Sequence, residues 1–192
     1  MFARPDARHP RSEGPSSLFK QESRIMSKAS FVPVWEMMRL RHGIGLRCIE
    51  ALPADQLDAR PIKDMRTPKE LVVHMYSFLR AAPESVVAGS LTVNEEADLR
   101  GIQSRADLAN YADECWKAAD AAFARITDAQ MSSMVKAPWG EMKGDLMIGS
   151  VTEEYLHHRG QLYAYLRQLG VAPPVNWDYE GSAAEYQPKQ HA

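Results

Sequence analysis

The sequence DLMIGSVTEEYLHHRGQLYAYLRQL, residues 145–169, carries the clearest structural signal in this chain. Its inward positions recur every three or four residues, which is the spacing of one face of an α-helix. Gly170 follows directly, with Pro173 and Pro174 just beyond, and glycine followed by proline is typical of a helix end. The segment therefore predicts a long helix that packs one face against a core. That face consists of Met147, Val151, Glu154, His158, Leu162, Tyr165 and Leu169.

Three further segments carry apolar residues at the same helical spacing. The second of them begins at Thr67-Pro68-Lys69-Glu70, with a capping hydroxyl, a proline at the first position and a glutamate that can reach back to the cap. Ser104, with Asp107 three residues later, predicts the start of the third segment in the same way. Pro83 should kink or end the second helix. The three segments run over about 32–51, 68–83 and 104–127.

The connectors 90–103 and 128–144 show no sustained alternation of apolar and polar residues, so we predict loops without strands there. Four long helices joined by three connectors predict an all-α protein, a four-helix bundle. The bundle domain should span 30–180. Residues 1–29 lack apolar periodicity and predict a disordered N-terminal tail. Residues 181–192 are polar and predict a loose C-terminal tail.

The composition of the 192-residue chain argues against several classes of protein. Its formal charge of −2 at pH 7 provides no positive field for nucleic acid, so we expect no nucleic-acid partner. It has no run of eighteen apolar residues, so the sequence predicts no membrane span. Cys48 and Cys115 lie far apart within helical patterns, which favours two reduced core thiols in a cytoplasmic protein.

Three ionisable side chains, His74, Glu154 and His158, interrupt the predicted core. Glu154 and His158 lie four residues apart and therefore share one helix face, while His74 lies within the apolar face of the second helix. A carboxylate on a core face is costly unless it is paired or bound to a metal. Two imidazoles and one carboxylate suit a divalent cation such as zinc, nickel, iron or manganese, with coordination positions left open. The alternative is a hydrogen-bonded Glu–His pair without a metal.

The motif EEYLHHRGQL at 153–162 continues through Tyr-Leu-Arg at 165–167 to Leu169-Gly170 and Pro173-Pro174. This sequence resembles the DinB family of damage-inducible metalloproteins. The resemblance covers roughly residues 31–180 and includes the Thr67-Pro68 cap. It implies a DinB-like four-helix bundle that forms a homodimer. It also implies a divalent metal held by three histidines, one from the second helix and two, four residues apart, from the last.

Carried over to this chain, the resemblance makes His74 the first ligand and His158 the last, whereas the middle position is Glu154. Glutamate can ligate the same metals through oxygen, so the site either persists with harder character or has lost its metal. Some members of the family are thiol-dependent enzymes. The resemblance therefore implies that this chain is a thiol-dependent transferase or a hydrolase-like enzyme, with a small thiol or another small molecule as substrate. The alternative is a non-catalytic stress-response bundle in which these residues form a metal-free buried polar network.

The sequence does not settle the roles of two other histidines, His42 and His157. His42, on the first helix, could lie beside the metal position as a fourth ligand or a proton carrier. His157 is rotated by about 100° from His158 on the same helix, because an α-helix has 3.6 residues per turn. We therefore expect His157 to face a neighbouring helix or a dimer partner.

Overall fold

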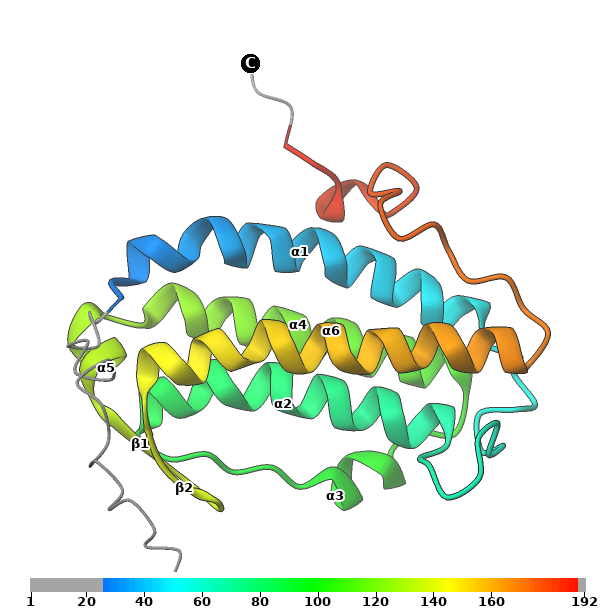
Figure 1. Cartoon of the computed structure of the whole chain (residues 1–192), viewed down its shortest axis with the longest axis horizontal. Helices are drawn as coiled ribbons and strands as arrows, with labels where there is room; N and C mark the ends of the chain where they lie inside the picture. The colour runs from blue at the N-terminus through cyan, green and yellow to red at the C-terminus, as the bar shows by residue number, and fades with distance from the viewer. Residues whose placement is uncertain (1–25, 190–192) are drawn as a thin grey trace, which may run out of the picture.

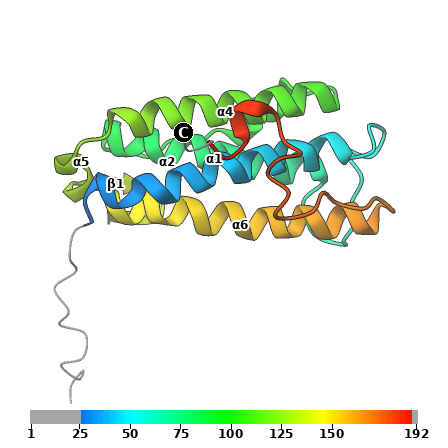
Figure 2. The ribbon, with the colours of Figure 1, turned by 90° about the horizontal axis from the view of Figure 1, so that it is seen from above.

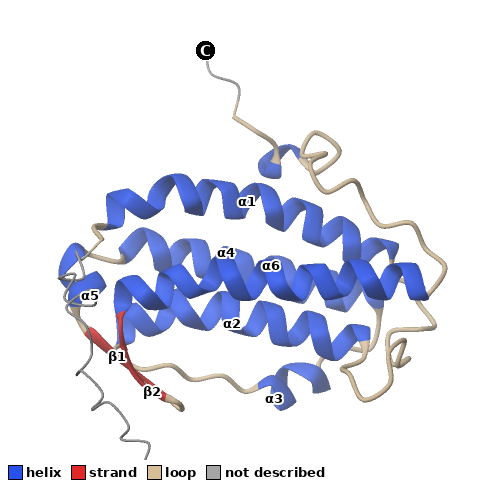
Figure 3. Cartoon of the chain, viewed as in Figure 1, coloured by secondary structure: helices blue, strands red, loops and turns tan. Residues whose placement is uncertain are grey.

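The computed structural model describes residues 26–189 of the chain. Four long helices form an elongated bundle in this part, with a small hairpin and short helices at its edges (Figures 1 and 3). The predicted four-helix bundle is therefore confirmed. In chain order the elements are α1 (Lys28–Ala51), α2 (Pro68–Ala88), α3 (Glu95–Arg100), α4 (Arg105–Arg125), α5 (Asp128–Ser132), β1 (Met134–Ala137), β2 (Gly140–Lys143), α6 (Gly144–Gln168) and the 3-10 helix η2 (Ala184–Tyr186).

The four long helices surround one core. Helix α2 packs against α4 and α6, and α1 packs against the same two helices. Helices α1 and α2 therefore lie diagonally across the bundle (Figures 1 and 2). Within residues 26–189, none of the helices has the length and apolar character needed to cross a membrane. The largest fully buried side chains are those of Tyr76, Tyr155, Tyr165, Met38, Ile44, Ile49, Leu52, Leu71, Leu79, Leu108, Met131 and Met147.

Two predicted helix starts are confirmed by their capping hydrogen bonds. The Thr67 hydroxyl accepts from the Glu70 amide at 3.2 Å, and the Glu70 carboxylate accepts from the Thr67 amide at 2.8 Å. The Ser104 hydroxyl accepts from the Asp107 amide at 3.1 Å. These bonds satisfy amides that have no partner within the helix. Helix α2 continues past Pro83 and ends before Gly89, whose φ of 82° is the left-handed conformation that glycine adopts most easily.

The prediction of simple loops for the two connectors is wrong. The first connector contains α3, and the second contains α5 and an antiparallel hairpin of β1 and β2. Strands of four residues are too short to show a clear alternation in sequence. Backbone hydrogen bonds fix the hairpin to the segment that follows α2: the Leu91 amide donates to the Lys136 carbonyl at 2.7 Å, and the Lys136 amide donates to the Gly89 carbonyl at 3.0 Å.

The predicted N-terminal tail, residues 1–29, lies mostly in residues 1–25, which are outside the described part. The rest of it differs from the prediction, because α1 already begins at Lys28. The Lys28 amide donates to the Asp128 carboxylate at 2.8 Å, and the Met26 amide donates to the Asp145 carboxylate at 3.2 Å. These bonds tie the start of α1 to the starts of α5 and α6. Apolar spacing gives no sign of such polar anchors.

The C-terminal segment also differs from the prediction of a loose tail, over its described residues 181–189. It runs back from the end of α6 across α1 (Figure 2). Tyr186 is buried, forms an edge contact with the His42 ring at 4.7 Å between centroids, and donates a hydrogen bond to the Asp113 carboxylate. Gly43 permits this approach, because a Cβ there would lie 2.6 Å from the Tyr186 Cβ. The predicted boundary at 180 therefore cuts through packed structure.

Replacing Tyr186 by phenylalanine should lower the free energy of unfolding by about 1.5–3 kcal/mol, the usual contribution of a hydrogen bond to a charged group. Hydrogen bonds from His42, Lys117 and Tyr186 hold the pKa of the Asp113 carboxyl below its usual value. The loss should therefore be complete above about pH 4, the ordinary aspartate pKa, and shrink only at lower pH, where Asp113 in the folded protein takes up its proton. Urea unfolding at several pH values measures it.

The control for this prediction is Tyr179→Phe, because Tyr179 is partly buried and its hydroxyl donates a weak hydrogen bond to the Met37 sulfur, at 3.7 Å, and contacts no carboxylate among residues 26–189. Its free energy of unfolding should change by less than about 0.5 kcal/mol. Equal stability of Tyr186→Phe and Tyr179→Phe would show that the C-terminal segment contributes nothing to the fold through Asp113.

Candidate metal centre

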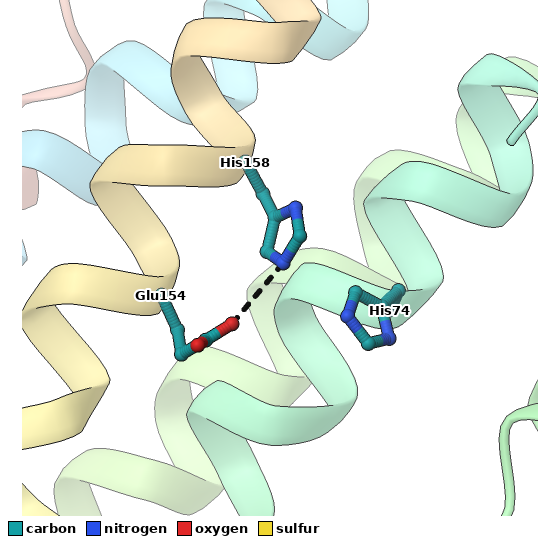
Figure 4. Close-up of side chains that lie close together, drawn as sticks. All are labelled: His74, Glu154 and His158. Atoms are coloured by element: carbon teal, nitrogen blue, oxygen red, sulfur yellow. Dashed lines mark hydrogen bonds and ion pairs between the residues drawn. The ribbon is translucent and has the colours of Figure 1, made fainter. Parts of the chain in front are cut away.

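The structure brings together the three side chains that the sequence predicts as ligands. His74 projects from α2 toward Glu154 and His158 on α6 (Figure 4). Each offers a nitrogen or oxygen atom, and these atoms lie within 4.8 Å of one another. The His158 Nε2 is 3.2 Å from the Glu154 Oε2, and the two imidazole rings meet edge to face, 4.7 Å apart. Two helices of the bundle thus contribute to one cluster.

The cluster lies at the rim of the bundle, which corrects the prediction that Glu154 occupies a core position. Its side chain is 49% exposed, whereas the neighbouring Tyr155 is fully buried. One residue rotates the helix by about 100°, so the core face of α6 passes through Val151, Tyr155 and Leu162, and Glu154 falls at its edge. His158 is buried and His74 is partly exposed. The full burial penalty expected for Glu154 therefore does not arise.

Each of the two histidines has an oxygen partner at Nδ1. The Glu95 carboxylate is 2.7 Å from the His74 Nδ1, and the Gln161 side-chain oxygen is 3.2 Å from the His158 Nδ1. Such partners fix the ring orientation and leave the Nε2 lone pair available to a metal. Burial lowers the pKa of the His158 imidazole, and the nearby His74 lowers it further, so the neutral form that ligates metals is favoured.

Glu95 is the residue of this site that could not be predicted from the sequence. It opens α3, in a connector that shows no helical periodicity, and it reaches His74 across twenty-one residues of chain. No spacing rule links residues in such a loop to a distant helix face. The sequence does carry one local sign of the short helix: Asn94 is followed by two acidic residues, as at many helix starts. In the structure the Asn94 side chain accepts a hydrogen bond from the Ala97 amide.

The three residues fit a divalent transition metal. Two ligand atoms bound to one ion at about 2.0–2.3 Å lie at most about 4.6 Å apart. The observed separations, up to 4.8 Å, therefore require only small side-chain rotations, which the half-exposed Glu154 permits. Two imidazole nitrogens and one carboxylate oxygen form a donor set common to zinc, nickel, iron and manganese.

His42, whose role the sequence left open, lies outside this cluster and is not placed as a fourth ligand. Its ring is fully buried, with Nδ1 3.0 Å from the Tyr76 hydroxyl and Nε2 3.4 Å from the Asp113 carboxylate. Burial lowers the pKa of this imidazole. The ring belongs to a polar network closed by Tyr186. It lies on α1, which is diagonal to the helix that carries His74.

His157 is exposed beside the cluster, with its Nε2 2.9 Å from the Gln161 side-chain nitrogen. It contacts the His158 ring at 4.9 Å between centroids but is not among the clustered ligand atoms. Its predicted contact with a dimer partner stays a prediction. Cys48 and Cys115 are buried and unpaired, as predicted. Burial raises the pKa of each thiol to about 11, so both stay protonated and unreactive near neutral pH.

The sequence of this chain matches a known protein family. The family model described as the DinB superfamily matches residues 46–162, more than half of the chain. None of the curated proteins matches significantly.

Solved structures of three bacterial proteins share the fold. A DinB-like protein from Bacillus subtilis has a TM-score of 0.60 and 19% identity, and the match covers 74% of this chain and 96% of that one. A DinB-like protein from Bacillus cereus ATCC 10987 has a TM-score of 0.61 and 16% identity, over 79% and 98%. A protein described as belonging to the DinB family, from Exiguobacterium sibiricum 255-15, has a TM-score of 0.54 and 25% identity, over 76% and 97%. The family match and the shared bundle together show that this chain belongs to the DinB superfamily.

Proposed function

We propose that this protein binds one divalent transition-metal ion through His74, Glu154 and His158 and uses it in a thiol-dependent transfer or hydrolytic reaction on a small molecule. The observation that supports the proposal most directly is the convergence of three ligand atoms from α2 and α6, all within 4.8 Å. A bound divalent cation supplies Lewis acidity, which brings the pKa of a coordinated water or thiol toward neutrality.

The residues at this site have different roles. Glu95 and Gln161 orient the two imidazoles through their Nδ1 atoms. Glu154 adds one negative charge, so the charge on a divalent ion would be only partly neutralised by the protein. A metal ion in this site would therefore attract an anionic nucleophile, such as a thiolate, more weakly than the same ion held by three neutral histidines. The exposed side of Glu154 leaves the cluster accessible to a small molecule from solvent.

A second candidate is a metal-free polar network, and specific contacts favour it. The His158–Glu154 pair, at 3.2 Å, and the His74–Glu95 pair, at 2.7 Å, already satisfy these side chains without an ion. In that case the protein is a non-catalytic bundle, and the pairs stabilise the packing of α2, α3 and α6. Metal content separates the two candidates.

Protein purified without chelators should contain close to one divalent transition-metal ion per chain, because the ligand atoms are already gathered. Elemental analysis by plasma mass spectrometry measures this content. The same sample, stripped with a chelator and dialysed, should take up one equivalent of zinc or manganese in calorimetric titration. A sample that is metal-free as purified and that also takes up neither ion would contradict the proposal and favour the polar network.

A further inference from the structure

A cavity of about 340 Å³ opens beside the ligand cluster. Its volume lies in the range of small-molecule sites. Two of its lining residues belong to the cluster, so a molecule in the cavity can reach the ligand atoms directly. The lining consists of His74, Phe78, Trp139, Met142, Ser150 and Glu154.

Away from the cluster, the wall of this cavity is aromatic and apolar. Phe78 lies one turn after His74 on α2, and Trp139 lies in the turn between β1 and β2. Their ring centroids are 6.4 Å apart, and the planes are tilted by 42°. Among the described residues, no lysine or arginine lines the cavity. An apolar group is therefore favoured there over a carboxylate or a phosphate, which would require a cationic partner.

Trp139 is 63% exposed, an unusual position for so large an apolar side chain. Its backbone is nevertheless well anchored. Val135 of β1 is buried, and β1 is bonded through Lys136 to the residues that follow α2. The end of the hairpin is fixed as well, since the Gly144 amide donates to the Ser133 carbonyl at 3.0 Å. The hairpin that carries Trp139 is thus fixed at its base, and the indole lies beside Phe78 with most of its surface accessible.

We propose that the cavity binds the aromatic ring of a substrate whose oxygen, nitrogen or sulfur donor reaches the metal site, with Trp139 and Phe78 as the walls that contact the ring. This inference rests on the proposed function and adds the substrate class to it. A ring beside two aromatic side chains gains stacking or edge contacts as well as burial. Ser150 also lines the cavity, so its hydroxyl can bond to one polar substituent of the ring.

Two hydroxamates test the inference on the zinc-loaded full-length protein. Benzohydroxamate and acetohydroxamate carry the same metal-binding group and differ in a phenyl ring in place of a methyl group. Calorimetric titration should show that wild-type protein binds benzohydroxamate about tenfold more tightly. Trp139→Ala should abolish most of that preference and leave acetohydroxamate affinity unchanged. Trp139→Phe should keep most of it, because an aromatic wall remains.

The matched control is Trp177→Ala, which removes another exposed tryptophan, outside this cavity, and should keep the full preference. A Trp139→Ala protein that still prefers benzohydroxamate tenfold would overturn the inference. So would a wild type that binds the two hydroxamates equally.

A metal-independent measurement separates this inference from the proposed function. In metal-free ¹⁵N-labelled protein, millimolar benzyl alcohol should shift the Trp139 indole N–H resonance, assigned by its loss in Trp139→Phe, while the same concentration of ethanol should not. If neither hydroxamate binds but this shift occurs, the metal proposal fails and the aromatic site stands. If hydroxamates bind without preference and benzyl alcohol causes no shift at Trp139, the aromatic site fails and the metal proposal stands.

Discussion

Glu154→Gln should lower the affinity for zinc or manganese at least about a hundredfold, because it replaces the only anionic ligand by a neutral and weaker oxygen donor. Loss of even an outer-shell partner typically costs ten- to a hundredfold in metal affinity, and a direct ligand should cost no less. The fold should be unaffected, since the Glu154 side chain is half exposed and the amide can still face the His158 Nε2. Calorimetric or competition titration of the stripped protein gives the affinity.

Glu153→Gln is the matched control for this prediction. Glu153 is the preceding residue on α6, is exposed, and is not among the clustered ligand atoms. The Glu153→Gln protein should keep the wild-type affinity for zinc and manganese.

Glu154→His should produce the three-nitrogen donor set that the family resemblance implies and shift selectivity from manganese toward zinc. Equal affinity of Glu154→Gln and Glu153→Gln would remove Glu154 from the site.

Gly45→Ala should lower the free energy of unfolding by about 2–4 kcal/mol, because overpacking and a disturbed buried hydrogen bond both contribute. A Cβ at this position would overlap the Tyr155 hydroxyl oxygen and lie 2.6 Å from that of Tyr76. Those two buried hydroxyls are 3.2 Å apart, and Tyr155 also donates to the Arg41 carbonyl at 3.0 Å. Neither ring can move aside without breaking a buried hydrogen bond. Urea unfolding measures the loss.

The control for Gly45 is another glycine within a helix, Gly160. Among the described residues, apart from its two chain neighbours and the backbone of α6, no atom lies within 4 Å of the position that a Cβ would take there. Gly160→Ala should therefore raise the free energy of unfolding by up to about 1 kcal/mol through helix propensity. Combining Gly45→Ala with Tyr155→Phe should recover part of the loss, because the overlapping oxygen is gone. A Gly45→Ala protein as stable as Gly160→Ala would contradict the close packing of α1 against these tyrosines.

The long helices could be predicted because their signals are local. A capping hydroxyl at Thr67 and a glycine at position 170 act within a few residues, and the helical period extends over many turns. The same period gives a helix face only to within one residue. For this reason the sequence places Glu154 in the core, although the buried residue at this turn is its neighbour Tyr155 and Glu154 lies at the edge of the buried face.

The remaining features depend on contacts between distant parts of the chain. Glu95 contributes to the site only because α3 folds back against α2, and the hairpin exists because its base pairs with residues that follow α2. The C-terminal segment has a polar sequence, yet one tyrosine, Tyr186, anchors it through Asp113. Such single long-range contacts leave no periodic pattern. Helical spacing alone does not show that His74 and His158 meet. Their convergence could be predicted because the family resemblance implies that the second and the last helix share one metal site.

The anchoring of Tyr186 changes where this domain begins and ends. The matched family region, 46–162, starts partway along α1 and stops before the end of α6. A protein trimmed to those limits would lack Trp35, which stacks on Phe123 at 4.4 Å, and would also lack His42, the ring that Tyr186 contacts. The packed structure is therefore longer than the matched region of the family model, because it extends from the start of α1 to Gln187.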